Sequence, residues 1–149
     1  MAAVAMAAAY GTPMEVIRRT IKEFAGVEHR IEFVREKDGV AYYNDSKGTN
    51  PDAAIKGIQA MNRPTVLIGG GYDKDSEYEE WIQAFDGKVK LLVLVGATKE
   101  KIAEAAERVG FVSYVMADSF EEAVEKCIEA AEPGGCSFVI AGMCKLGNV

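Results

Sequence analysis

Polar side chains that could bind a ligand or take part in a reaction are concentrated in one segment, Tyr43-Asn44-Asp45-Ser46-Lys47-Gly48-Thr49-Asn50, which Pro51 follows. The run supplies a carboxylate, an ammonium group, two aliphatic hydroxyls and two carboxamides. Asparagine is a favoured N-cap and proline a favoured first helical residue, so the run is expected to end at a helix N-terminus. A helix N-terminus with a lysine beside it attracts carboxylates and phosphates. The run therefore predicts an anion site, and a capped surface loop with solvated charges is the alternative.

A second run, Gly69-Gly70-Gly71-Tyr72-Asp73-Lys74, also stands between a predicted strand and a predicted helix. Its three glycines permit a close backbone approach or a positive φ, and Lys74 could then reach an anion. The spacing matches neither GxxxxGK[ST] nor GxGxxG, so neither nucleotide-binding fingerprint applies. A tight turn accounts equally well for the glycines.

Other reactive side chains are few. The one histidine, His29, precedes Arg30 at the start of a predicted strand, where a packed or surface role is commoner than catalysis. The three cysteines, Cys127, Cys136 and Cys144, show no CxxC spacing and no histidine at metal-ligand or nucleophile spacing. We therefore predict no metal site and expect reduced thiols.

The elements that position these residues alternate along the chain. Apolar, β-prone runs are found at 31–35, 40–43, 65–69, 90–95, 112–116 and 137–141. The first two flank Lys37-Asp38-Gly39, which predicts a hairpin. The last four begin at intervals of about 22–25 residues with helical patterns between them, and capping-box sequences begin at Ser76 and Ser119. We predict an α/β fold, a three-layer Rossmann-like domain with a mostly parallel sheet of about six strands and an antiparallel edge hairpin. Ligands bind beyond the C-terminal ends of such strands, where both polar runs fall.

The first 25 residues have a different pattern. Residues 2–9 form an alanine-rich helical run that ends near Gly11, and Thr12 is expected to cap a second helix with Pro13 at its first position. Apolar side chains recur at helical spacing in that helix, at Met14, Ile17, Ile21 and Phe24. Two helices without a sheet indicate the end of another domain, so we divide the chain into residues 1–25 and 26–149.

Composition limits the function classes. The 149 residues are 49% hydrophobic and carry a formal charge of −6, which suits a globular domain and disfavours a binder of nucleic acid. No apolar run is long enough to span a membrane, and the alanine-rich start lacks the basic residues of a signal peptide. We expect a cytoplasmic location without nucleic-acid or membrane partners.

Three segments in this order and spacing resemble the MurD-type, glutamate-adding Mur ligases: Gly26-x-x-His29-Arg30-Ile31-Glu32-Phe33-Val34, Gly39-Val40-x-Tyr42-Tyr43 through Asn44-Asp45-Ser46-Lys47-Gly48-Thr49-Asn50, and Leu67-Ile68-Gly69-Gly70-x-x-Asp73-Lys74. The string Asn-Asp-Ser-Lys-x-Thr-Asn distinguishes the glutamate-adding ligases from their relatives. Related Mur ligases and folylpolyglutamate synthases usually carry an Ala-His-Asn-Pro or Ala-His-His-Pro type sequence there. The resemblance runs from about residue 3 to about residue 140.

The resemblance implies an enzyme of three domains that uses ATP and Mg²⁺ to add D-glutamate to UDP-N-acetylmuramoyl-L-alanine during peptidoglycan precursor synthesis. This chain resembles the C-terminal, glutamate-binding domain, preceded by the last helices of the central domain. By the resemblance, Arg30 and Asp45 face the nucleotide. Lys47, Thr49 and Lys74 surround the incoming D-glutamate and the reactive phosphate, and Lys47 takes the catalytic role.

The resemblance also implies that the phosphate loop, the magnesium ligands and the UDP pocket lie outside these 149 residues. The chain alone is therefore expected to be inactive and to hold no cofactor tightly, and its N-terminal helices could mediate self-association. The alternative from another class is a non-catalytic α/β module that binds a small anionic ligand through the same loops. An unrelated Rossmann-like domain is a third possibility, against which the missing GxGxxG argues.

The sequence departs from the family after about residue 140. Mur ligases of this type resemble Ser-Pro-Ala-Cys-Ala-Ser-Trp-x-x-Phe there, whereas this chain reads Ala141-Gly142-Met143-Cys144-Lys145-Leu146-Gly147-Asn148-Val149. Codons for these residues can be chosen so that reading one base later gives Pro-Ala-Cys-Ala-Ser-Trp-Gly-Met. We interpret the tail as the product of a one-base slip, which leaves the domain truncated; sequencing the DNA tests this.

Overall fold

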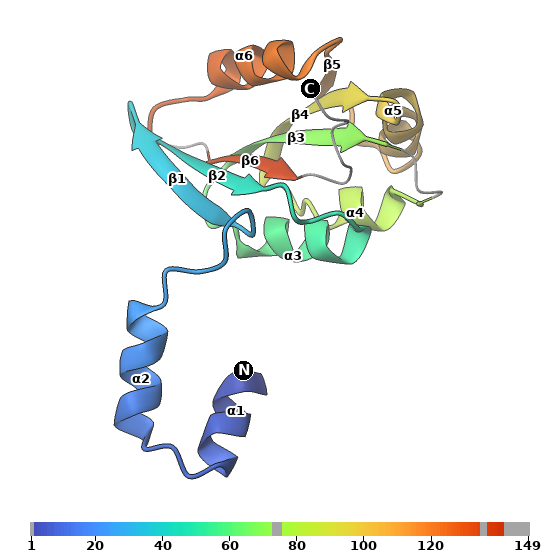
Figure 1. Cartoon of the computed structure of the whole chain (residues 1–149). Coiled ribbons are helices and arrows are strands. Elements are labelled where there is room, and N and C mark those ends of the chain that lie inside the picture. Colours follow the sequence, from blue (N-terminus) through green and yellow to red (C-terminus); the bar gives the residue numbers. More distant parts are fainter. Residues whose placement is uncertain (1, 73–75, 135–136, 142–149) are drawn as a thin grey trace.

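A single mixed sheet organises the computed structural model, which describes residues 2–72, 76–134 and the backbone of 137–141. The strand order within these residues is β1-β2-β6-β3-β4-β5. The strands are β1 (Glu32–Lys37), β2 (Val40–Asp45), β3 (Thr65–Gly71), β4 (Val89–Gly96), β5 (Tyr114–Met116) and β6 (Ser137–Ala141). Hairpin β1–β2 is antiparallel, and every other neighbouring pair is parallel (Figure 1). The predicted α/β fold with a parallel sheet and an antiparallel hairpin is confirmed.

Helices cover both faces of the sheet. They are α3 (Pro51–Ala60), α4 (Glu79–Gln83) and α5 (Lys99–Arg108) on one face and α6 (Phe120–Ala130) on the other (Figure 1). Strand β3 shows why, because Leu67 packs with α3, α4 and α5 whereas its neighbours Val66 and Ile68 pack with α6. Successive side chains of a strand point to opposite faces, so a strand buried on both faces carries consecutive apolar residues, as Val66, Leu67 and Ile68 do here.

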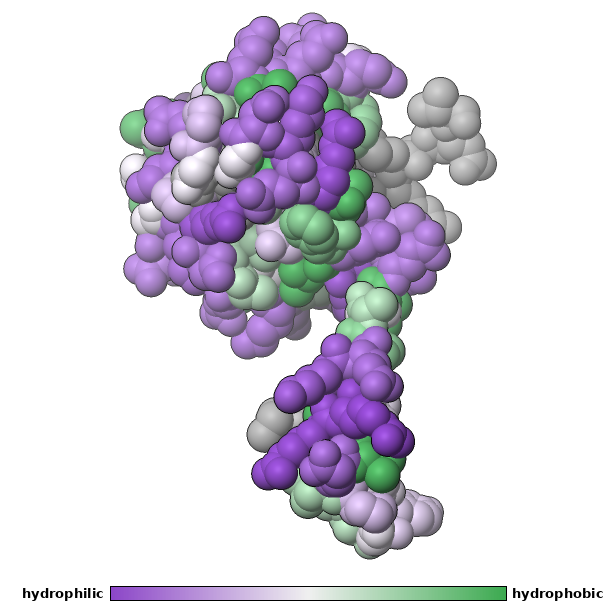
Figure 2. All heavy atoms as spheres, turned by 90° about the vertical axis from the view of Figure 1, so that its left-hand side faces the viewer, coloured by the Kyte–Doolittle hydropathy of each residue, from purple (hydrophilic) through white to green (hydrophobic). Residues whose placement is uncertain are grey.

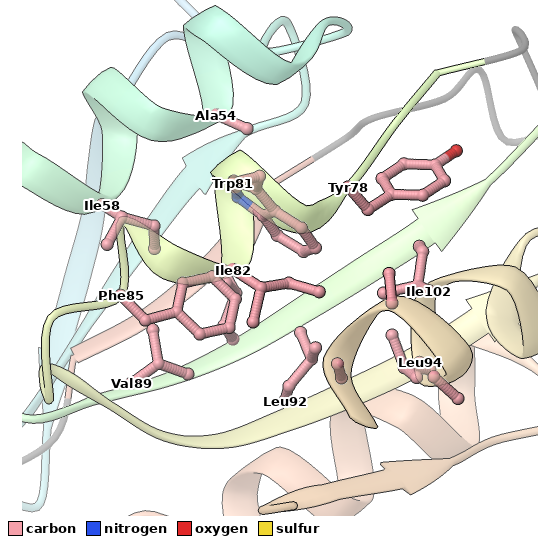
Figure 3. Packing of buried hydrophobic residues seen from close by; sticks show 14 of the residues in the cluster. Ala54, Ile58, Tyr78, Trp81, Ile82, Phe85, Val89, Leu92, Leu94 and Ile102 are labelled. Carbon is pink, nitrogen blue, oxygen red and sulfur yellow. The ribbon is translucent and has the colours of Figure 1, made fainter. Parts of the chain in front are cut away.

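The larger half of the core is built around Trp81 of α4, which is completely buried (Figure 3). Its ring makes an edge-to-face contact with Phe85 at 5.1 Å, and Phe85 makes another with Phe111 at 5.1 Å. A Cβ on Gly69 of β3 would lie 2.7 Å from Cη2 of Trp81, so the ring requires a glycine beneath it. The indole Nε1 finds no hydrogen-bond partner among the residues that the structure describes.

Two predicted helix N-termini are confirmed. Asn50 Oδ1 accepts a hydrogen bond from the amide of Ala53 at 2.8 Å, and Pro51 takes the first position of α3. Ser119 Oγ accepts from the amide of Glu122 at 3.1 Å at the start of α6. In both cases a side-chain oxygen satisfies an amide that the helix itself cannot pair.

Two other predicted N-termini are wrong. Pro13, not Thr12, is the N-cap of α2 (Met14–Glu23), because the amide of Thr12 donates to Ala7 O at 3.0 Å and so closes the preceding helix. Helix α4 begins at Glu79, not after Ser76. The Glu79 carboxylate accepts a hydrogen bond from the amide of the adjacent N-cap residue, Tyr78.

Helices α1 (Ala2–Ala9) and α2 pack on each other and lie apart from the sheet (Figures 1 and 2). Ile17 is 6% exposed, whereas Met14, Ile21 and Phe24 are 48%, 55% and 66% exposed. The expected amphipathic helix is present, but most of its apolar face is uncovered. No helix among the described residues has the length and apolar character to cross a bilayer.

Candidate functional site

The edge formed by the C-terminal ends of the strands is the candidate site. Strands β2, β6, β3 and β4 all run in one direction, so Asp45, Gly71 and Gly96 end at the same edge. Strand β6 separates β2 from β3, which places their ends two strand spacings, or about 10 Å, apart. The topology thus brings the starts of both polar runs to one edge. Lys74 itself lies outside the described residues, so its convergence with Lys47 stays a prediction.

A tight turn after β2 carries Lys47 and Thr49. The amide of Gly48 donates to Asp45 O and the amide of Thr49 to Lys47 O, both at 2.9 Å. The Lys47 side chain is exposed, Thr49 is half-buried, and Asn50 then caps α3. An ammonium and a hydroxyl therefore stand beside the positive end of a helix, an arrangement that suits a carboxylate or a phosphate.

Asp45 is turned into the protein. Its residue is 2% exposed, and Oδ1 accepts a hydrogen bond from the amide of Ile31 at 3.1 Å. Burial raises the pKa of this carboxyl above its ordinary value, and the Ile31 hydrogen bond and the charge of Arg30 oppose that rise. In this conformation the described partner of the carboxylate is therefore the chain's own backbone.

Arg30, the other residue predicted at the nucleotide side, lies in a strained loop. The residues on either side of it, His29 and Ile31, have φ values of +62° and +48°, each of which costs of order 1–3 kcal/mol for such residues. The amide of Lys47 donates to His29 O at 2.9 Å, and Asn44 Nδ2 lies 2.9 Å from His29 Nδ1. The Arg30 side chain remains exposed. Contacts from the end of β2 and from the turn after it thus hold the loop in this strained conformation.

This attachment escaped the sequence analysis. His29 was expected to be a packed or surface residue, and it is exposed, but its contact with Asn44 joins positions that are 15 residues apart. No local pattern announces such a pairing. A positive φ at a β-branched residue such as Ile31 also has no sequence signature, because glycine or asparagine is the usual choice there.

The glycine run has a structural reason of its own. Gly70 has a φ of +127°, and a Cβ there would lie 2.0 Å from Val95 O on β4. Thr98, which is buried, donates to Gly71 O from both its amide, at 3.2 Å, and its hydroxyl, at 3.4 Å. The close backbone approach predicted from these glycines is made to the neighbouring strand.

A surface hollow of about 650 Å³ was not predicted from the sequence. It is lined by Ser76, Glu77, Tyr78, Glu79, Lys101 and Arg108. Arg108 Nη2 donates to Glu79 Oε1 at 2.6 Å, and this hydrogen bond lowers the pKa of the Glu79 carboxyl. Both signs of charge line the hollow and its strongest pair is internally neutralised, which makes it a weaker anion site than the turn after β2. Among the described residues, no cluster of three or more histidine, cysteine or acidic side chains could hold a metal ion.

Comparison with known proteins identifies a family whose sequences match most of this chain. The family described as Mur ligase, glutamate ligase domain, matches residues 29–144. The chain is 60% identical over 134 residues to the UDP-N-acetylmuramoylalanine–D-glutamate ligase of Lachnoclostridium phytofermentans, and 54% identical over 133 residues to that of Lachnospira eligens. The alignments cover 90% and 89% of this chain and 30% of each relative, so the chain spans about 30% of the length of these curated relatives.

Solved structures share the fold at low identity. The UDP-N-acetylmuramate-alanine ligase MurC of Thermotoga maritima superposes with a TM-score of 0.72 at 15% identity, covering 95% of this chain and 33% of that one. A bifunctional folylpolyglutamate synthase/dihydrofolate synthase of Yersinia pestis has a TM-score of 0.66 at 19% identity, covering 87% and 31%. These likenesses concern the fold.

Proposed function

Because the chain belongs to the Mur ligase family, through its glutamate ligase domain, we propose that it is the C-terminal domain of an ATP-dependent ligase. The proposed enzyme adds D-glutamate to UDP-N-acetylmuramoyl-L-alanine in peptidoglycan precursor synthesis. The observation that carries the proposal is the turn of Asp45-Ser46-Lys47-Gly48-Thr49, held at the end of β2 and against the N-terminus of α3. Relatives 60% and 54% identical carry that ligase name.

The domain division belongs to the same proposal. We take residues 1–25 as the last helices of a central domain and residues 26–149 as the glutamate-binding domain, a three-layer Rossmann-like unit of six strands. The separation of α1 and α2 from the sheet supports this division (Figure 1). From residue 142 onward, the tail assigned to the proposed frame slip lies outside the described part of the chain.

The proposed reaction assigns a role to each site residue. ATP, with Mg²⁺, supplies the phosphoryl group that turns the substrate carboxylate into an acyl phosphate. The amine of D-glutamate then attacks the acyl carbon, an amide forms and phosphate leaves. Lys47, Thr49 and Lys74 would hold the carboxylates of D-glutamate and the departing phosphate in line, while Arg30 and Asp45 serve the nucleotide side.

Ligand titration of the ¹⁵N-labelled chain tests this assignment. We expect D-glutamate to shift the amide signals of residues 46–53 weakly in the unsubstituted chain. Loss of one charge-assisted hydrogen bond costs about 1.5–3 kcal/mol, or roughly ten- to a hundredfold in affinity, so Lys47→Ala should abolish the response. Lys56→Ala is the matched control. It also removes one ammonium group, but Lys56 lies on α3 and its Nζ donates to Gln59 Oε1 on that helix.

Three outcomes would count against the proposal. Equal responses from Lys47→Ala and the unsubstituted chain would remove Lys47 from the site. Sulfate shifts as large as those of D-glutamate would favour the module that binds small anions in general. ATP hydrolysis or D-glutamate ligation by the 149-residue chain would show that the missing machinery is not required.

A further inference from the structure

The carboxylate of Asp45 occupies a space that two glycines leave open. A Cβ on Gly48 would lie 2.7 Å from Asp45 Oδ2, and a Cβ on Gly57 would lie 2.9 Å from the same oxygen. Real Cβ atoms essentially never come so close to another atom. Either side chain would therefore displace the carboxylate or the segment that carries it.

Of the two glycines, Gly57 says more about the role of Asp45, because a residue other than glycine would be expected at its position. It is buried in the interior of α3, where glycine is less favourable than alanine. Its φ is not in the left-handed region, so the backbone alone does not require glycine. The feature that explains glycine at this position is the oxygen of Asp45.

The other oxygen of the same carboxylate reaches the strained loop. Oδ1 accepts from the amide of Ile31, the residue after Arg30, at 3.1 Å. A side chain that displaces Oδ2 therefore also displaces Oδ1, the oxygen that accepts the hydrogen bond from the loop. The connection runs from Gly57 on α3, through Asp45 at the end of β2, to the backbone beside Arg30.

We propose that Gly57 is a positioning residue: it keeps the Asp45 carboxylate seated so that the carboxylate holds the His29–Ile31 loop, and with it Arg30, at the nucleotide side of the site. The role of Arg30 toward the nucleotide rests on the proposed function. The seating of Asp45 and the attachment of the loop stand on the geometry alone.

Amide exchange in the ¹⁵N-labelled 149-residue chain tests the seating. In Gly57→Ala we expect the amide of Ile31 to exchange at least about tenfold faster relative to the core amide of Leu67, since its hydrogen bond to a charged acceptor is weakened. Gly69→Ala is the matched control: its Cβ would meet Trp81 at 2.7 Å, a similar clash far from Asp45. It should lower the global stability without raising the exchange rate of the Ile31 amide relative to that of Leu67.

A pH titration separates positioning from general loosening. In the unsubstituted chain the proton shift of the Ile31 amide should follow the titration of Asp45, with a midpoint above the ordinary aspartate value, because burial raises that pKa. The midpoint should move down in Gly57→Ala, as the displaced carboxylate gains solvent, and stay unchanged in Gly69→Ala. His29, which is part of the loop, and Glu32, whose carboxylate accepts a hydrogen bond from the His29 amide, are followed through their own signals so that they are not mistaken for Asp45.

The outcomes are distinct. An unchanged exchange ratio and midpoint in Gly57→Ala, or the same changes in Gly69→Ala, would overturn the proposed role of Gly57. Gly48→Ala, which presses on the same oxygen, should reproduce the effect if one substitution proves too unstable. ATP should perturb the Arg30 signals in the unsubstituted chain and in Gly69→Ala more than in Gly57→Ala. No response to ATP in the unsubstituted chain would count against the nucleotide role under the proposed function, while the Ile31 measurements still decide the seating.

Discussion

Deletion of residues 2–24 should leave the stability of the sheet unit unchanged, because α1 and α2 pack on each other. The two helices have 8 and 10 residues, and with a nucleation constant of about 10⁻³ and a propagation constant of at most about 1.6, an isolated helix of this length is populated to a few per cent. The burial of Ile17 adds little to that population. Local opening should therefore cost almost nothing, against roughly 5–15 kcal/mol for global unfolding of a domain.

Hydrogen exchange followed by mass spectrometry measures the difference. Peptides from α1 and α2 should exchange at close to the unprotected rate, whereas those from β3 and β4 should be slower by a factor of about 10³ or more. The urea midpoints of the full chain and of residues 26–149 should agree. Strong protection of both helices in a chain shown to be monomeric would refute the reasoning. Protection that rises with protein concentration would instead reveal self-association through the exposed face of Met14, Ile21 and Phe24.

Substitutions at three further positions test the packing and the surface charges. Gly70→Ala should lower the free energy of unfolding in urea by roughly 3 kcal/mol or more, because it combines a left-handed φ with a Cβ 2.0 Å from Val95 O. A loss below about 1 kcal/mol would contradict the close approach of β3 and β4. Trp81→Phe should cost much less than the about 3–5 kcal/mol of Trp81→Ala, because phenylalanine keeps much of the buried ring and removes an N–H that has no partner among the described residues. Equal losses from the two substitutions would contradict this packing argument. Arg108 lowers the pKa of Glu79 below its usual 4.5, so the pair stabilises the fold above that pH and the contribution disappears as the pH falls through the folded-state pKa. The stability difference between Glu79→Gln and the unsubstituted chain should accordingly shrink on acidification, and a difference that grew would reverse the sign of the argument.

The sequence predicted most of the elements, because the signals involved are local. Strand β3 shows a continuous apolar run flanked by glycine, which is what a strand buried on both faces requires. The cap of α3 is equally local, since the Asn50 side chain accepts from the Ala53 amide and Pro51 has no amide hydrogen that would need a partner. The failure at Thr12 has a local cause too: the residue that could begin α2 is already used to end α1.

The site was predicted less completely, because its contacts cross the chain. The run from Asn44 to Asn50 was identified from composition and resemblance, but nothing in it shows that Asp45 faces inward or that Ile31 donates to it. The insertion of β6 between β2 and β3, which spaces the two polar runs, also depends on pairing between distant segments. Gly57 carried no signal at all, since a glycine within a helical pattern suggests only a weak helix.

The net charge of the chain is negative, whereas the exposed charges at the candidate site are mainly positive. Which of the two governs anion binding depends on how far each charge lies from the site. The formal charge of −6 should repel a dicarboxylate, yet the exposed cations at the candidate edge are Arg30 and Lys47. At physiological ionic strength the Debye length is about 8 Å, so exposed carboxylates beyond that range are largely screened. Two carboxylates near this edge are engaged with the backbone: that of Asp45 is buried with a raised pKa and accepts a hydrogen bond from the Ile31 amide, and that of Glu32 accepts one from the His29 amide. The ammonium of Lys47, the guanidinium of Arg30 and the N-terminus of α3 therefore favour an anion at this edge and are opposed locally by the exposed carboxylate of Asp52 in the first turn of α3. Their proximity, against screened charges elsewhere, is why an acidic chain can present a site for anions here.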